Sequence, residues 1–227
     1  FFSTYGQRLL ATNFTDAIQT FTMGSSSTFS DLSAGAPLAR YVSQLKDFTV
    51  AGNTYDAIDG NVPHRVRWCA VGDPTTWTVS ASTQADYQDL ESSNGWVKQV
   101  YGGEYGVIFQ ERAISRMNYI GSPIVFQILP VETGRGLLAS GGSVKIGNFI
   151  FYLGLDGFYV FDGNQSIPIG ENKINMTFFN DVDLSYLDRI CSTADLDKQV
   201  IYWSYPGSGN SAGLCNKILM YNYAPNA

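Results

Sequence analysis

The chain has 227 residues, of which 44% are hydrophobic and only 15% are charged, and its formal net charge is −6. This length allows one large domain or two small ones, and the hydrophobic fraction excludes wholesale disorder. An acidic chain has no overall attraction for nucleic acid, and no apolar run approaches the roughly 18 residues of a membrane-spanning helix.

Aromatic residues and glycines indicate the fold class. Phe, Tyr and Trp make up 14% of the chain, and 23 residues are glycine. Aromatic residues favour strands, whereas glycine, asparagine and aspartate favour tight turns. The composition therefore predicts an all-β protein of short antiparallel strands, with less than about 10% helix.

Short β-rich runs separated by tight turns follow one another along the chain. Residues 24–33 are polar and of low complexity and predict a loop, and residues 183–190 predict about two turns of helix. Glu111-Arg112 and Asp156-Gly157 each lie between two aromatic or β-branched runs and predict hairpins. The predicted strands cover residues 5–12, 62–69, 104–110, 113–119, 146–153, 158–161, 165–170, 198–205 and 217–223.

These runs recur along the sequence. Comparable strands begin near residues 6, 65, 106, 147 and 198, a period of about 40 to 60 residues. Such a period with several strands per repeat is typical of a β-propeller, and we predict one propeller domain over residues 1–227. A two-sheet β-sandwich is the alternative, because it too is built from short strands. The pattern stops inside a repeat, so we expect further segments before residue 1 and after residue 227.

Few residues carry the chemistry that catalysis or metal binding requires. His64 is the single histidine, is expected in a turn or edge position at a strand start, and is not accompanied by a Gly-x-Ser-x-Gly motif. Cys69, Cys191 and Cys215 lack the spacing of a zinc site or a disulfide framework, and they predict buried free thiols in a reducing compartment. Residues 134–139 match a dinucleotide-binding motif by letter, but glycines follow where the motif needs a helix.

Pairs of acids leave a metal site open as an alternative. Asp181 with Asp183, and Asp195 with Asp197, are spaced to share one face of a strand if the chain is extended there. Acids in solvated turns are the commoner explanation of such pairs. We therefore predict no metal site, no cofactor and no catalytic residue, and no enzymatic activity.

A glycosidase is a second alternative. Asp56 with Asp59, or Glu104 with Glu111, could supply its two carboxylates, although nothing in the sequence pairs them across a cleft. Three aromatic residues are expected on loops and could stack on sugar rings or bases: Trp77, Tyr87 and Trp96. A place in the core or at a subunit interface is commoner for such residues.

Residues 65–77 read Arg-Val-Arg-Trp-Cys-Ala-Val-Gly-Asp-Pro-Thr-Thr-Trp. This segment resembles the R-x-R-W-S-x-x-G-D-P-x-x-W segment of virion proteins from tailed bacteriophages, with Cys69 in place of the serine. The resemblance continues at residues 103–112 and 149–163, and it covers about residues 65 to 223. Within it, Gly72-Asp73-Pro74 predicts a turn between two Trp-bearing strands.

The resemblance implies a virion protein similar to the β-propeller-containing tail nozzle or tail hub of short-tailed bacteriophages. Such a protein would be assembled in the bacterial host cytoplasm into a homo-oligomeric ring, most plainly a hexamer, beside other tail and adaptor proteins. Double-stranded DNA would pass through the ring during genome ejection without specific binding, which agrees with an acidic chain. A glycan-binding or depolymerising β-propeller tail protein is the alternative.

Overall fold

The computed structural model describes residues 1–224 of the chain, which forms two compact units. Unit 1 covers Phe1–Gly134, and unit 2 begins at Arg135. The prediction of a single domain over residues 1–227 stays a prediction. None of the helices in the described part of the chain is long and apolar enough to cross a membrane.

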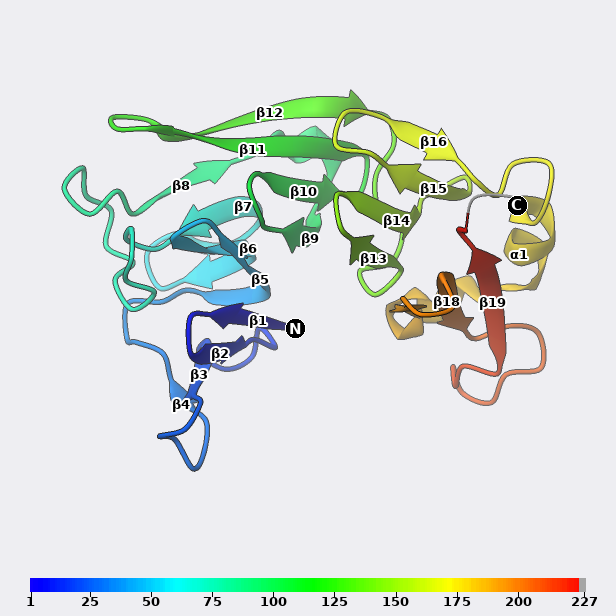
Figure 1. The fold of residues 1–227 in the computed structure, drawn as a ribbon, viewed down its shortest axis with the longest axis horizontal. Helices are drawn as coiled ribbons and strands as arrows, with labels where there is room; N and C mark the ends of the chain where they lie inside the picture. Colours follow the sequence, from blue (N-terminus) through cyan, green and yellow to red (C-terminus); the bar gives the residue numbers. More distant parts are fainter. Residues whose placement is uncertain (225–227) are drawn as a thin grey trace. The chain divides into compact units, whose positions relative to one another are not determined.

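Unit 1 consists of three four-stranded antiparallel sheets in which strands consecutive in sequence lie side by side (Figure 1). The sheet orders are β1-β2-β3-β4, β5-β6-β7-β8 and β12-β11-β10-β9. The strands are β1 (Phe2–Tyr5), β2 (Arg8–Ala11), β3 (Gln19–Thr22), β4 (Ser30–Asp31), β5 (Leu38–Leu45), β6 (Phe48–Asp56), β7 (Gly60–Trp68), β8 (Asp86–Asp89), β9 (Val97–Tyr101), β10 (Gly106–Gln110), β11 (Ala113–Gly121) and β12 (Val125–Thr133).

Unit 2 contains a four-stranded sheet, β13-β14-β15-β16, and a three-stranded sheet, β17-β18-β19. Helix α1 (Asn175–Asp181) and the 3₁₀ helix Leu184–Arg189 connect the two sheets, and unit 1 has one further 3₁₀ turn at Ser92–Asn94. The strands are β13 (Ser143–Ile146), β14 (Phe149–Leu153), β15 (Phe158–Phe161), β16 (Ser166–Pro168), β17 (Cys191–Asp195), β18 (Val200–Tyr205) and β19 (Lys217–Asn222).

The fold class predicted from the sequence is confirmed. The strands of residues 1–224 are distributed over five small up-and-down antiparallel sheets, each built from consecutive strands, and helix is confined to three short segments. Repeated small sheets of this kind make the fold all-β and β-propeller-like, whereas a sandwich would gather the strands into two sheets.

Both predicted hairpins are present. Leu153 pairs with Phe158 across Asp156-Gly157, and Phe109 pairs with Ile114 across Glu111-Arg112. Turn residues at fixed positions between β-forming runs are local signals, and they are sufficient to specify a hairpin.

The structure corrects four predictions of local structure. Residues 5–12 are not one strand, because Gly6 turns the chain between β1 and β2 with a φ of +58°. The loop predicted at residues 24–33 contains the short strand β4, which pairs with β3. The helix predicted at residues 183–190 is a 3₁₀ helix, and helix α1 before it was not predicted. Finally, the strand near residue 65 is the third of its sheet, whereas the other strands of the predicted repeat are the second of theirs. The strand of this sheet that corresponds to them is therefore β6.

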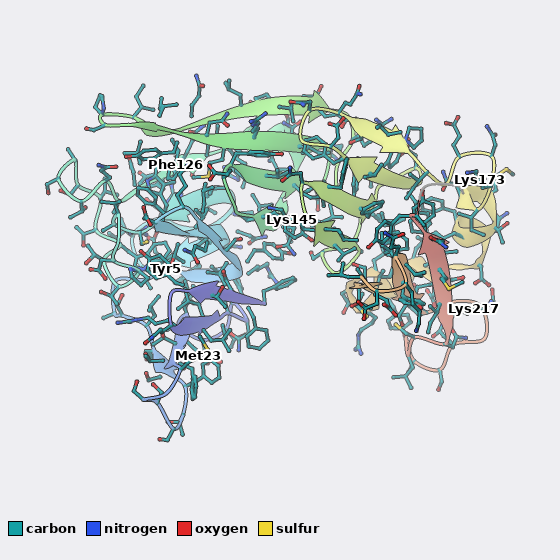
Figure 2. The ribbon with its side chains drawn as sticks, in the orientation of Figure 1. Tyr5, Met23, Phe126, Lys145, Lys173 and Lys217 are labelled. Carbon is teal, nitrogen blue, oxygen red and sulfur yellow. The ribbon has the colours of Figure 1, made fainter. Side chains whose placement is uncertain are left out.

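Each unit has its own aromatic core. In unit 1, the ring of Phe126 (labelled in Figure 2) lies 4.9 Å from that of Phe48 and 5.1 Å from that of Trp68, centroid to centroid. In unit 2, Phe158 contacts Phe178 and Trp203, each at 4.9 Å. These rings are nearly inaccessible to solvent, and burying each contributes about 1.5–3 kcal/mol.

Candidate functional site

The turn of the β6–β7 hairpin carries two acids at the same end of the sheet. Oδ1 of Asp56 accepts hydrogen bonds from the amides of Ile58 (2.9 Å) and Asp59 (2.8 Å). This Asx turn fixes residues 56–60, and Gly60 supplies the positive φ (+72°) with which the chain enters β7. Local sequence is therefore sufficient to bring Asp56 and Asp59 together.

Strand β7 contains an irregularity at residues 63–65, which include the first of its two arginines. Val62 pairs with Thr54 and Val66 pairs with Gly52, so residues 63–65 oppose the single residue Asn53. Pro63 is tolerated in this bulge because it has no N–H to donate to the ladder. His64 thus lies inside β7 rather than at a strand start, and its carbonyl accepts a hydrogen bond from Leu90.

At the end of the bulge and just beyond it, Arg65 and Arg67 of β7 share one face of the sheet with two residues of β8. Arg65 lies opposite Asp89 and Arg67 lies opposite Tyr87 in the β7–β8 register. Alternate residues of a strand point to the same face, so these four side chains gather there, whereas Val66 between the two arginines enters the core.

Arg65 is the centre of this cluster. Its guanidinium binds Asp89 through two hydrogen bonds (Nε–Oδ1 2.6 Å, Nη2–Oδ2 3.0 Å) and Asp59 through one (Nη1–Oδ2 2.5 Å), and it lies 3.9 Å from the ring centroid of Tyr87. Hydrogen bonds from Arg65 lower the pKa of Asp89, and the same bonds raise the pKa of Arg65. Since only 4% of Arg65 is exposed, its charge is neutralised inside the protein.

Arg67 joins the hairpin turn to the next loop. Its Nη1 contacts Asp56 Oδ2 at 3.1 Å, and its Nη2 donates to the carbonyl of Trp77 at 2.9 Å. Burial alone would raise the pKa of Asp56, but the two amides of its turn and the charges of Arg67 and Arg65 lower it overall. Burial lowers the pKa of Arg67, and Asp56 opposes that effect.

An open groove of about 850 Å³ runs along this cluster within unit 1. Its charged lining consists of Asp56, Asp59 and Arg67. Its exposed rim consists of Tyr55, Ile58, Val79 and Tyr87. The segment before β5 contributes Ala34, Gly35 and Ala36, β5 contributes Leu38, and Ala57 and Thr78 complete the lining. The groove therefore combines aromatic faces with a few polar groups.

The Gly72-Asp73-Pro74 turn follows the cluster and is held by its own aspartate. Asp73 accepts hydrogen bonds from the hydroxyls of Thr75 (2.6 Å) and Thr76 (2.7 Å). Trp68 ends β7 as predicted, but Trp77 lies in the loop between β7 and β8 rather than in a strand. Both indoles are buried, and the Trp77 indole N–H donates to the carbonyl of Pro74 at 2.8 Å.

The other acid pair proposed for a glycosidase is not brought together. Glu104 pairs with Lys46 and Glu111 with Lys98. The five residues of β10 separate the two glutamates, which at about 3.3 Å per residue amounts to roughly 17 Å. Glycosidase carboxylates lie about 5–9.5 Å apart, so these two are not such a pair.

The aromatic residues proposed for stacking have three different environments. Trp77 is buried, Tyr87 lies on strand β8 rather than on a loop, and Trp96 is half exposed before β9. Only Tyr87 lines the groove.

Asp181 and Asp183 fix a loop of unit 2. Asp181 ends α1, where it binds Lys217 (2.5 Å; labelled on β19 in Figure 2) and the hydroxyl of Tyr205 (3.0 Å). Asp183 precedes the 3₁₀ helix and binds the side-chain amide of Asn210 (3.0 Å). The two acids are not on an extended strand, and their carboxylates hold the β18–β19 loop.

In the second acidic pair, Asp195 is the last residue of β17 and Asp197 lies in the turn that follows. Asp195 accepts a hydrogen bond from the amide of Lys198 and forms an ion pair with its ammonium group, while Asp197 is exposed. In residues 1–224 no three His, Cys, Asp or Glu side chains are grouped as metal ligands.

The cysteines differ from the prediction. Cys69 is buried as expected, and burial raises its pKa to about 11, but Cys191 and Cys215 are exposed thiols. The letter match at residues 134–139 has no helix after it: the chain from residue 135 to residue 142 has no regular structure.

Sequence reasoning identified Asp56, Asp59 and Tyr87 one by one but missed the arginine cluster that unites them. The Arg-x-Arg spacing on a strand, which puts both guanidiniums on one face beside an acidic turn, is the signal that could have found it. The contact of Arg65 with Asp89, 24 residues away, has no local signature.

No protein-family model matches the chain, and no curated protein sequence matches it. Among solved structures, the extracellular domain of a hybrid two-component system from B. thetaiotaomicron is similar over 91% of this chain, with 14% identity and a TM-score of 0.51. This chain spans only 25% of the length of that protein's chain. AztD from Citrobacter koseri matches 99% of this chain and 68% of its own, with 12% identity and a TM-score of 0.49. A structure of apo AztD from the same organism gives 13% identity and 0.45, over 99% and 69%. At such identities the first of these similarities supports the fold class alone.

Proposed function

We propose that this chain is a structural subunit of a bacteriophage tail, part of a nozzle or hub ring through which the genome leaves. The observation that carries the proposal is the role of residues 65–77, the segment that resembles phage virion proteins. Its arginines form internal ion pairs, its two tryptophans are buried, and its aspartate fixes a turn. Residues used in this way specify an architecture rather than a reaction.

The ionisation of the acids in and beside the groove also favours a structural role over a depolymerase. A glycosidase needs one carboxyl group that stays protonated near neutral pH, and such groups have a raised pKa. The pKa values of Asp56 and Asp89 are lowered instead, and Asp59 is paired with Arg65.

Exposed apolar side chains support assembly with other subunits. Several large apolar residues are more than 60% exposed, among them Phe2, Ile124, Ile218 and Met220. Adjacent exposed apolar side chains favour interfaces between proteins, and Ile218 and Met220, two residues apart on β19, share one face of that strand. Closed cyclic symmetry is the plainest way for one chain type to enclose a DNA duplex. A homohexamer in contact with other tail and adaptor proteins is the form we propose.

Reconstruction of virions of the phage that encodes this chain tests the proposal. We expect density for the chain in a ring on the tail axis, with a continuous channel about 20 Å or more across to pass a DNA duplex. Density in a peripheral spike or in the capsid shell would overturn the conduit role, and so would virions that lack the chain altogether.

A further inference from the structure

We infer that the groove along β6, β7 and β8 of unit 1 binds an uncharged saccharide. The inference does not rest on a position in a phage tail, because it follows from the side chains of the groove alone. Its volume, about 850 Å³, falls within the roughly 300–1,000 Å³ of small-molecule sites.

Two tyrosine rings give the groove flat apolar surfaces. Tyr55 is 41% exposed and Tyr87 is 40% exposed, and both line the groove. The Arg65 guanidinium is buried and lies over the Tyr87 ring, so it covers the inward face of the ring and leaves the outward face accessible. A rigidly held aromatic face beside a groove suits the C–H surface of a pyranose ring, because such a surface is flat and apolar.

Polar groups without partners in the protein lie beside these rings. Within the described part of the chain, the hydroxyls of Tyr55, Tyr87 and Thr78 make no hydrogen bond, and Asp59 uses only Oδ2, in its contact with Arg65. Hydroxyl donors and one free carboxylate oxygen match the alternating donors and acceptors of a sugar's hydroxyl groups.

The charges of the groove select against ionic ligands. Asp56, Asp59 and Arg67 line the groove and Arg65 and Asp89 lie beside it, and every one of these charges is paired inside the protein. A phosphate or nucleic acid would meet two carboxylates and one arginine along the groove, and the charge of that arginine is already paired with Asp56. An uncharged, hydroxyl-rich ligand is therefore the best match, and a proline-rich peptide is the rival that an experiment must separate.

Saturation-transfer NMR on the 227-residue chain, with maltose, lactose and N,N′-diacetylchitobiose as probes, tests this site. At least one disaccharide should receive magnetisation from the protein, with a dissociation constant in the millimolar range. Tyr55→Ala and Tyr87→Ala should each weaken its binding about tenfold, whereas Tyr87→Phe should keep it within about threefold.

Tyr105→Ala is the matched control. Tyr105 carries an arginine over its ring just as Tyr87 does (Arg116, 4.1 Å), but it does not line the groove. This variant should bind the disaccharide as the unchanged chain does. If Tyr87→Ala fails to fold, Tyr55→Ala alone tests the site. The Tyr55 hydroxyl makes no hydrogen bond in residues 1–224, so its removal breaks none.

Three results would overturn the inference. The first is no transfer to any of the three disaccharides, and the second is transfer that Tyr55→Ala leaves unchanged. The third is transfer to decaproline but to none of the sugars. None of these bears on the virion reconstruction, so the saccharide site and the tail role fail separately.

Discussion

Arg65 is 4% exposed, and its guanidinium contacts three carboxylates and an aromatic ring. Removing it leaves Asp59 and Asp89 without their counter-charge. Both carboxylates keep some contact with water, with side chains 39% and 42% exposed, so the loss is smaller than for a fully buried pair. We expect Arg65→Met to lower the free energy of unfolding by about 2–3 kcal/mol in urea titrations.

Lys46→Met is the control for that experiment. Lys46 pairs with the exposed Glu104, and exposed pairs contribute less than about 1 kcal/mol. If the two substitutions cost the same, the arginine cluster does not stabilise unit 1 beyond an ordinary surface contact.

The lowered pKa of Asp89 makes part of the stability depend on pH. A carboxyl group whose pKa is lower in the folded state than in the unfolded chain stabilises the fold above its unfolded pKa, about 3.9. That contribution disappears as pH falls through the folded value. The unchanged chain should therefore lose more stability between pH 6 and pH 3 than Asp89→Asn, as measured by urea midpoints.

Asp86→Asn is the matched control for the pH experiment. Asp86 lies on the same strand, and no arginine contacts its carboxylate in the described residues. Its pH profile should follow that of the unchanged chain. An Asp89→Asn profile as steep as that of the unchanged chain would show that the Arg65–Asp89 contact does not form in solution.

Among the elements, hairpins were the easiest to predict from the sequence, because their signals are local. Asp156-Gly157 and Glu111-Arg112 sit between runs that can only be strands, and both hairpins form. The phase of the repeat was harder. The alternating run near residue 65 is β7, the third strand of its sheet, whereas the strands near residues 6, 106, 147 and 198 are the second strands of theirs.

The candidate site could be predicted only in part. The acids of the β6–β7 turn and Tyr87 belong to residue types typical of binding sites, but their grouping depends on the register of β7 with β8. Strands β7 and β8 are separated by a 17-residue connection, so their register is decided by the packing of the whole sheet, which no short segment encodes.

The chain just after β9 lies very close to β5 at Gly102. Gly102 follows β9, and its amide donates to Ser43 Oγ at 2.8 Å, at the end of β5. A Cβ at this position would lie 1.7 Å from the carbonyl oxygen of Gln44. Gly102→Ala should therefore force these two sheets apart and lower the free energy of unfolding by about 3 kcal/mol, measured by urea denaturation.

Gly35→Ala is the control, since a Cβ there meets nothing within 4 Å. We expect this second substitution to change stability by less than about 0.5 kcal/mol. Equal effects of the two would mean that β5 and β9 are not in contact through Gly102.

At the scale of the whole molecule, the net charge of −6 predicts that the chain does not bind DNA. Proteins that bind DNA without specificity do so with dissociation constants of about 10⁻⁴–10⁻⁶ M at physiological salt, through many basic contacts. This chain should not change the fluorescence anisotropy of a labelled 20-base-pair duplex at protein concentrations up to about 100 µM.

The same titration at about 50 mM salt is its control. Lower salt strengthens binding by basic patches by orders of magnitude, so a hidden patch would appear there. Anisotropy that rises as salt falls would show that positive charge is concentrated on one surface, contrary to a channel through which DNA slides freely.

The buried thiol of Cys69 is held by two hydrogen bonds. Its sulfur accepts a hydrogen bond from the amide of Thr49 at 3.0 Å and donates one to the carbonyl of Ala70 at 3.2 Å. A serine hydroxyl can fill both of these roles in the same small space. Cys69→Ser would therefore keep both hydrogen bonds of this buried position. Cys69 is the position at which residues 65–77 differ from the segment that they resemble, and the hydrogen bonds made there are ones that either side chain can form.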